Sequence, residues 1–163
     1  MNNITIIDNY LDKKLFESIK YGIVYSTKIN WNLNIGVSSS SSNDGTYFTH
    51  MIYNQFKPMS EYFDLIFPLL RVINPFVISR IKINFYPTTK TIENHDFHVD
   101  GDIPHKAAIF YLNTNDGKTI FSDGKEIESI ENRIIFFDPM IMHKSTTCTN
   151  DLVGRYNINF NYY

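Results

Sequence analysis

The sequence contains a single cysteine, Cys148, among its 163 residues. One thiol cannot close a disulfide within the chain, and a cysteine-based zinc site is excluded for the same reason. Any bound metal must therefore be held by nitrogen and oxygen ligands. Cys148 has no basic neighbour that would favour a reactive thiolate, so we interpret it as a small buried hydrophobe and assign it no role.

Long apolar runs and an excess of charge of one sign are also lacking. No stretch approaches the roughly 20 apolar residues that a membrane span requires, and the N-terminus has no basic leader followed by an apolar stretch. The 15 basic and 17 acidic residues form no basic block, so the chain has no electrostatic footprint for nucleic acid. We expect a cytoplasmic protein without membrane passage, and a nucleic-acid partner is disfavoured.

The composition fits a globular protein, with 43% hydrophobic and 15% aromatic residues. A chain of this length can form one domain with a sizeable core. We expect a single domain over residues 1–163. Residues 1–76 are predicted to form a strand and helical layer, and residues 77–163 a β-rich core.

Helical spacing appears twice in the N-terminal part. After a short β-rich run, Leu11, Leu15 and Ile19 recur at the interval of one helix face. A second pattern lies in MSEYFDLIFPLL, residues 59–70, where Ser60 is a candidate N-cap. Pro68 is expected to kink or end this second helix.

A serine-rich segment separates the two helical patterns. The run SSSSS at 38–42, followed by NDG, is too polar for a core and predicts a loop over residues 38–45. Aromatic residues around it, such as Trp31 and Tyr47, are expected to pack in the core. A loop of this kind beside a barrel mouth can also close over a substrate, so a lid is the alternative.

From residue 77 onward the periodicity changes from helical to two. Roughly seven short β-branched or aromatic runs are separated by Gly, Pro, Asn and Asp, which is typical of an all-β sandwich or barrel. The runs are VISRIKINFYP, HKAAIFYLN, KTIFSD, KEIESI, RIIFFDP, HKSTTCT and GRYNINFNYY. Helices do not alternate with these strands, so a parallel doubly wound sheet is not expected.

Two of the runs separate polar from apolar side chains. The polar faces consist of Arg155, Asn157, Asn159 and Asn161 in one strand and Arg80, Lys82, Asn84 and Tyr86 in the other. In the simplest interpretation each polar face meets water. The alternative is that these faces line a barrel mouth, where polar side chains would contact a ligand.

The stretch NHDFHVDGD, residues 94–102, is rich in potential metal ligands. Its His98 and Asp100 form an H-x-D, and a period of two puts both side chains on the same side of an extended segment. Alone this motif is weak, because composition often produces it, and a polar loop is the alternative. His143 follows the predicted strand RIIFFDP and offers a third ligand. Two histidines and one carboxylate on neighbouring strands form the facial triad of non-haem Fe(II) oxygenases.

Other residues test this interpretation. His95 and His105 flank the motif, and a zinc cluster of His95, His98 and His105 can be drawn as an alternative. That cluster leaves His143 and Arg155 without a role. Arg155, on the strand after His143, can instead offer a fork of donors to the far carboxylate of a dicarboxylate that chelates the iron.

The H-x-D at 98–100, the histidine at 143 and the arginine at 155 together resemble the Fe(II)- and 2-oxoglutarate-dependent dioxygenases. The resemblance is to the prolyl 4-hydroxylase-like branch and its small single-domain bacterial and phage-type relatives. It runs from about Arg80 to the C-terminus, with a looser match in IIDNYLDKKLFESI. It implies a mainly β fold, a double-stranded β-helix (a jelly-roll or cupin-like barrel), with N-terminal helices packed on it.

The resemblance also implies site residues. It assigns His98, Asp100 and His143 to the Fe(II) ligands, and Arg155 to the distal carboxylate of 2-oxoglutarate. Tyr111 in AIFYLN resembles a tyrosine that hydrogen-bonds this carboxylate, and Tyr86 in NFYP resembles one that reaches the co-substrate near the metal. For both tyrosines a core-packing role stays open.

The implied reaction uses O₂ and converts 2-oxoglutarate to succinate and CO₂ while a substrate is hydroxylated. Asp100 favours hydroxylation, because halogenating relatives carry a small residue there. Thr88 after the YP pair and the lone Gly117 depart from the glycine pattern of prolyl hydroxylases. A peptidyl proline is the substrate expected by analogy, with a small metabolite or a nucleobase as the alternative. A catalytically silent jelly roll that serves as a binding or structural module is the third interpretation.

Overall fold

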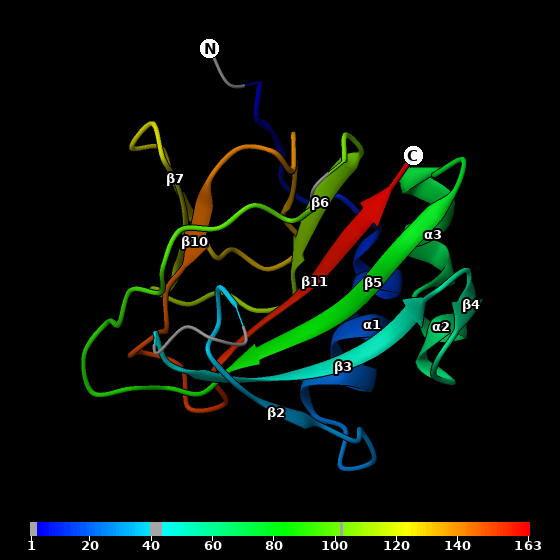
Figure 1. Cartoon of the computed structure of the whole chain (residues 1–163). Coiled ribbons are helices and arrows are strands. Elements are labelled where there is room, and N and C mark those ends of the chain that lie inside the picture. Colours follow the sequence, from blue (N-terminus) through cyan, green and yellow to red (C-terminus); the bar gives the residue numbers. More distant parts are fainter. Residues whose placement is uncertain (1–2, 40–43, 102) are drawn as a thin grey trace.

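The computed structural model describes residues 3–39, 44–101 and 103–163, and more of them belong to strands than to helices (Figure 1). The strands are β1 (Thr5–Ile7), β2 (Asn32–Ile35), β3 (Thr46–Asn54), β4 (Lys57–Pro58), β5 (Ile78–Tyr86), β6 (Lys106–Tyr111), β7 (Lys118–Phe121), β8 (Glu126–Glu128), β9 (Ile134–Phe137), β10 (His143–Ser145) and β11 (Arg155–Tyr162). The helices are α1 (Lys13–Val24), α2 (Tyr62–Leu65) and α3 (Phe67–Ile73). None of the helices in these described ranges is long and apolar enough to cross a membrane.

Two antiparallel sheets make up the fold. The main sheet has the order β1-β9-β6-β11-β5-β3-β2, with β4 paired to β3, and the small sheet has the order β10-β7-β8. Apolar side chains from β6 and β9 pack against Phe121 and Ile127 of the small sheet. The predicted mainly β jelly-roll architecture is confirmed.

Each of the seven runs predicted after residue 77 contains one strand, from β5 to β11. Three strands within residues 1–76 were not expected from the sequence, namely β2, β3 and β4. β3 pairs with β5 along most of its length, from Phe48 opposite Phe85 to Asn54 opposite Arg80. The main sheet therefore extends into the N-terminal part, on both sides of the serine-rich loop. Residues 40–43 of that loop lie outside the described residues.

The first helix lies against the outer face of the main sheet. Asp12 caps it, because its carboxylate accepts a hydrogen bond from the backbone N–H of Lys14 at 2.9 Å. The buried side chains of the helix are Phe16, Ile19, Ile23 and Val24. The predicted face is wrong at Leu15, which is 42% exposed. The aromatic Phe16 takes the inward position, since it packs edge-on against Phe110 at 6.0 Å.

Pro68 divides the second helical segment, as predicted. α2 ends at Leu65, and α3 starts at Phe67 with the proline in its first turn, where a missing N–H costs nothing. Ser60 is not the N-cap, which is Glu61. The Ser60 hydroxyl nevertheless accepts a hydrogen bond from the N–H of Tyr62 at 3.1 Å.

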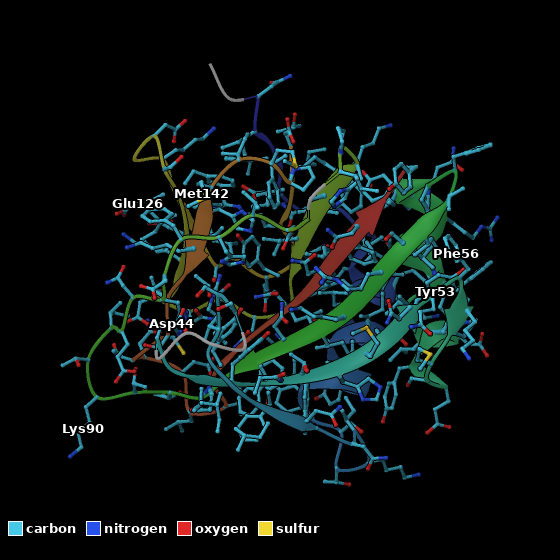
Figure 2. All side chains as sticks on the ribbon, in the orientation of Figure 1. Asp44, Tyr53, Phe56, Lys90, Glu126 and Met142 are labelled. Carbon is cyan, nitrogen blue, oxygen red and sulfur yellow. The ribbon has the colours of Figure 1, made fainter. Side chains whose placement is uncertain are left out.

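The central strand β11 is buried along its whole length. Its apolar residues Tyr156, Ile158, Phe160 and Tyr162 join the core under the helices. The opposite face carries Arg155, Asn157, Asn159 and Asn161, all less than 10% exposed. This polar face is buried, so the simplest interpretation is wrong for β11, and its residues line two pockets instead. That these side chains contact a ligand stays a prediction. Side chains fill the space between sheet and helices, while those of Lys90 and Glu126 project outward (Figure 2).

Candidate active site

Two segments far apart in the sequence bring His98 and His143 together. The chain between β5 and β6 runs beside β10, where His98 pairs with His143 and Asn94 with Thr146. The N–H of each histidine donates to the carbonyl of the other, both at 2.9 Å. This reciprocal pairing sets the two imidazoles side by side, with ring centroids 4.7 Å apart.

His98, Asp100 and His143 form a compact cluster, in which one ligand atom from each lies within 4.8 Å of the others. The Nδ1 atom of His143 is 2.9 Å from the carbonyl oxygen of Ile141, and that of His98 is 3.4 Å from the carbonyl oxygen of Asp96. An Nδ1–H that donates to a carbonyl leaves the lone pair on Nε2, which is the tautomer that binds a metal ion. The Nε2 atom of His143 lies 3.9 Å from the Asp100 carboxylate.

The surroundings favour the charge states that a metal ion needs. Burial would raise the pKa of Asp100, but the charges of His143, Arg80 and His98 outweigh it and the pKa is lowered. Burial and the neighbouring His143 lower the pKa of His98. Asn159 donates to the Asp100 carboxylate at 3.3 Å and Arg80 lies 3.7 Å from it. At neutral pH the cluster therefore presents a carboxylate beside an uncharged His98.

The alternative zinc cluster does not form. Among the described residues, the triad is the only set of three potential ligands that lie together. The Nδ1 atom of His95 is 2.8 Å from the hydroxyl of Ser145. The ring of His105 contacts the carbonyl of Ile103 at 2.8 Å and the amide of Asn161 at 2.6 Å.

Arg155 is completely buried, and its guanidinium makes three hydrogen bonds. It donates to the hydroxyls of Ser129 and Thr119 at 2.7 and 3.0 Å and to the carbonyl of Thr146 at 3.2 Å. Within the described part of the chain, no carboxylate lies within the 4.0 Å of a salt bridge to it. A buried cation without a counterion is costly, so this position favours binding of an anion.

The two tyrosines singled out from the sequence both lie against this guanidinium. The guanidinium carbon is 5.2 Å from the ring centroid of Tyr86 and 5.8 Å from that of Tyr111. Burial raises the pKa of both phenols, so both stay protonated donors. Tyr86 lines the inner cavity with Arg155, whereas Tyr111 lies behind it and donates to Thr119 at 2.8 Å.

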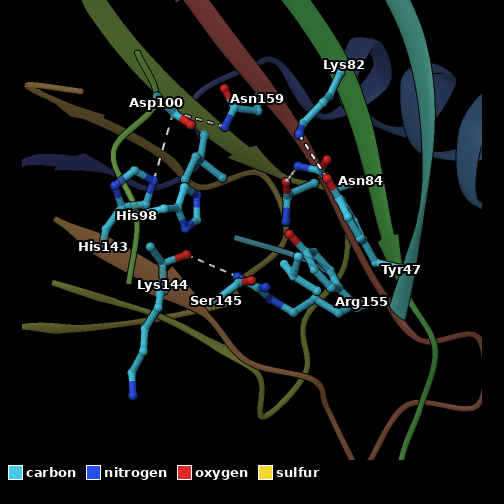
Figure 3. A pocket seen from close by; sticks show the side chains of 15 residues that line it. Tyr47, Lys82, Asn84, His98, Asp100, His143, Lys144, Ser145, Arg155 and Asn159 are labelled. Carbon is cyan, nitrogen blue, oxygen red and sulfur yellow. Dashed lines mark hydrogen bonds and ion pairs between the residues drawn. The ribbon is translucent and has the colours of Figure 1, made fainter. Parts of the chain in front are cut away.

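An inner cavity connects the triad to Arg155 (Figure 3). Its floor is the polar face of β5 and β11, where Arg155 pairs with Tyr86, Asn157 with Asn84, and Asn159 with Lys82. The side-chain oxygens of Asn84 and Asn159 are buried and have no partner among the described residues. Such orphaned acceptors in a cavity indicate that a ligand or water completes it.

Some lining residues were not singled out from the sequence. These are Val37, Tyr47, Thr119 and Ser145. Thr119 and Ser145 oppose each other across β7 and β10. Only this pairing of strands distant in the sequence brings them to the cavity, so no local signal could identify them.

His95 gives the metal-free protein a specific sensitivity to acid. It is 2% exposed, and burial together with the charge of Arg155 lowers its pKa from 6.5 to about 4. As the pH falls, His95 is therefore protonated in the unfolded chain before it is protonated in the folded protein. The contribution of the neutral imidazole to the free energy of unfolding is complete above pH 6.5 and is lost as the pH falls toward 4. Between pH 7 and pH 5 we expect wild type to lose about 2 kcal/mol more unfolding free energy than His95→Gln.

Urea unfolding at the two pH values, in the presence of a chelator, measures this difference. His105→Gln removes a partly exposed imidazole and serves as the matched control, which should follow wild type. Equal losses for wild type and His95→Gln would show that the buried imidazole does not couple folding to protonation.

Comparison with known proteins supports the fold. No family model and no curated protein matches the sequence. Solved structures do match. A prolyl hydroxylase from Trichoplax adhaerens, in complex with a hypoxia inducible factor peptide fragment, is 14% identical with a TM-score of 0.73, over 100% of this chain and 84% of that one.

Two further solved structures have the same fold. The viral collagen prolyl hydroxylase of Paramecium Bursaria Chlorella virus-1, a 2-oxoglutarate complex, is 14% identical with a TM-score of 0.63, over 97% of this chain and 93% of that one. A 2-oxoglutarate-Fe(II) oxygenase family oxidoreductase from Burkholderia pseudomallei is 10% identical with a TM-score of 0.68, over 98% and 84% of the two chains. The chain thus has the fold of the prolyl hydroxylases and 2-oxoglutarate-Fe(II) oxygenases.

Proposed function

We propose that this protein is an Fe(II)- and 2-oxoglutarate-dependent dioxygenase that hydroxylates an organic substrate. One observation carries the proposal: a single cavity is lined both by a set of two histidines and a carboxylate and by a buried guanidinium that has no carboxylate partner among the described residues. A structural metal site does not require a buried guanidinium in the same cavity. A module that only binds anions does not require two histidines and a carboxylate arranged as metal ligands.

The triad fits Fe(II) in chemistry as well as in number. Two imidazoles and one carboxylate on one side of the ion leave adjacent positions free for other ligands. Asn159 and Arg80 hold the carboxylate of Asp100 in place, and backbone carbonyls orient the two imidazoles. Phe121 and Phe137 pack around the ring of His143 at 5.9 and 4.9 Å, which restricts its rotation.

Arg155 fits the distal carboxylate of 2-oxoglutarate. A guanidinium has five N–H groups, of which three are used within the protein, so two remain for a ligand. Tyr86 lines the cavity beside it and is proposed to donate its hydroxyl to the co-substrate. Tyr111 is proposed to act on this carboxylate indirectly, by fixing Thr119 and one face of the guanidinium.

When bound, the iron and 2-oxoglutarate supply the oxidising chemistry, which consumes O₂ and releases succinate and CO₂. The protein contributes binding and orientation. Arg155 sets the distance of the co-substrate from the triad, and the buried walls keep bulk water out of the cavity.

The substrate class is a separate question. Two of the solved structures with this fold are prolyl hydroxylases, so a peptidyl proline is the candidate by analogy. A small metabolite or a nucleobase is the second candidate.

An anaerobic titration tests the proposal. Metal-free protein receives Fe(II) and then 2-oxoglutarate, while the visible metal-to-ligand charge-transfer band of the chelate is recorded. We expect a band that saturates at one equivalent of each. Glutarate lacks the keto oxygen needed for chelation and serves as the control, which should give no band. A folded protein that shows no band with 2-oxoglutarate would support the catalytically silent module.

A further inference from the structure

A second, wider space opens beside the triad. It is a cleft of about 460 Å³ between β2, the segment that follows it, and the ends of β3 and β5. His98 and Asp100 border both this cleft and the inner cavity. A molecule in the cleft therefore lies next to the proposed metal ion, and Arg155 is not among the residues that line this cleft.

The wall of this cleft carries two cationic side chains, Arg80 and Lys82, on the inward face of β5. The ammonium of Lys82 donates to the Tyr47 hydroxyl at 3.2 Å and lies 5.4 Å from that ring. Within the described residues no carboxylate is within 4.0 Å of it. Burial and the charge of Arg80 lower the pKa of Lys82 to about 8. The nearby negative charge therefore compensates only a small part of the cost of burying this ammonium.

The charges within the proposed site balance without Arg80 and Lys82. The charges of Fe(II) and Arg155 cancel those of Asp100 and the two carboxylates of 2-oxoglutarate. Arg80 lies 3.7 Å from Asp100, the single acidic residue among the described residues of the cleft wall. Once a metal ion takes up the charge of Asp100, the cleft wall has net positive charge.

Lys82 borders both the inner cavity and the cleft, whereas Arg155 borders the inner cavity and is not among the residues that line the cleft. Lys82 pairs with Asn159, whereas Arg155 pairs with Tyr86, four residues further along β5. At the rise of a strand this separates the two backbone positions by roughly 13 Å. An anion that is bound in the cleft near Lys82 is therefore a second anion, distinct from the distal carboxylate held by Arg155.

We infer that the substrate of this protein carries an anionic group, a carboxylate or a phosphate, which Lys82 and Arg80 bind in the cleft beside the metal. The inference rests on the proposed function and narrows its substrate. An unmodified prolyl side chain offers no charge to these cations. The anionic group can belong to a small molecule or to a residue that flanks the oxidised one in a peptide.

Calorimetric titration of paired probes tests this inference on protein loaded anaerobically with Fe(II) and 2-oxoglutarate. The pairs are L-glutamate against L-glutamine, O-phospho-L-serine against L-serine, and a short peptide that contains aspartate against the same peptide with asparagine. Inorganic phosphate is added as a minimal anion. We expect at least one acidic probe to bind roughly tenfold or more tightly than its neutral partner. The pair that shows the difference tells carboxylate from phosphate and small molecule from peptide.

Lys82→Met should reduce that preference to less than about threefold, and Lys82→Arg should keep most of it. Lys144→Met is the matched control: Lys144 is not among the residues that line the cleft, and its ammonium lies over the ring of Phe97 at 4.8 Å and points away from the site (Figure 3). It should bind the acidic probe as wild type does.

Three results would overturn the inference. The first is that no acidic probe, phosphate included, binds to the loaded protein. The second is that Lys82→Met keeps the preference. The third is that Lys82→Met loses the charge-transfer band, which would place Lys82 on the co-substrate. Loss of the band in wild type is a different outcome and contradicts the proposed function itself.

Discussion

Replacement of His143 by alanine is expected to lower Fe(II) affinity by at least about a hundredfold and to abolish the charge-transfer band. His143 is one of the three ligands of the triad, and its Nε2 atom lies 3.9 Å from the carboxylate of Asp100. Two remaining ligands cannot hold the ion in the same geometry, and even loss of an outer-shell partner typically costs 10–100-fold in metal affinity. The Fe(II) affinity of the variant, measured by anaerobic calorimetry, gives the size of the effect.

His105→Ala is the matched control for this experiment. Its imidazole belongs to the zinc cluster drawn from the sequence, but it contacts Ile103 and Asn161 and not the triad. We expect it to bind Fe(II) as wild type does. If His105→Ala lost the metal ion and His143→Ala retained it, the assignment of the ligands would be wrong.

Replacement of Arg155 by glutamine is expected to weaken 2-oxoglutarate binding while Fe(II) binding stays near the wild-type value. Removal of one partner from a buried, hydrogen-bonded charge pair costs about 2–5 kcal/mol, or roughly 30- to several-thousand-fold in affinity. The concentration of 2-oxoglutarate at half saturation of the band should rise by that factor. Glutamine keeps a donor for the hydroxyls of Ser129 or Thr119, which limits damage to the fold.

Arg133→Gln is the control for this variant, because it removes an arginine of the surface. Arg133 pairs with Asp8 at 2.5 Å and lies outside the cavity. Wild-type affinity for 2-oxoglutarate in Arg155→Gln would show that the co-substrate carboxylate binds elsewhere. Loss of Fe(II) binding in Arg155→Gln, with a normal unfolding transition, would also contradict the assignment.

The part of the fold that the sequence predicts is the part with local periodicity. The strands β5 to β11 are short β-branched or aromatic runs that Gly, Pro, Asn and Asp separate, so each is recognisable by itself. β3 is different, because its aromatic residues Tyr47, Phe48 and Tyr53 can equally be interpreted as core residues beside a loop. Its place in the sheet depends on pairing with β5. The face of α1 was predicted wrongly because Leu15 and Phe16 are both apolar, and only the packed neighbours decide which turns inward.

The candidate site also contains some residues that the sequence identifies and others that only the folded structure brings together. His98, Asp100, His143 and Arg155 could be selected because their order and spacing along the chain carry information. The position of Tyr47 beside Lys82 could not, because it depends on the contact between β3 and β5. From the sequence, Lys82 could be identified only as one of several polar residues on a predicted strand. Whether such a face meets water or a ligand is decided by the layers that cover it.

The position of β11 has a consequence for biosynthesis. This strand lies between β5 and β6 in the main sheet, although about 40 residues of chain follow β6 before it begins. While the ribosome is still making those residues, β5 and β6 have no partner between them and expose unpaired edges. The polar floor of the cavity, which β11 completes with Arg155 and Asn159, cannot form before this strand has been synthesised. In a nascent chain the inner cavity is therefore incomplete until the central strand has been inserted between β5 and β6.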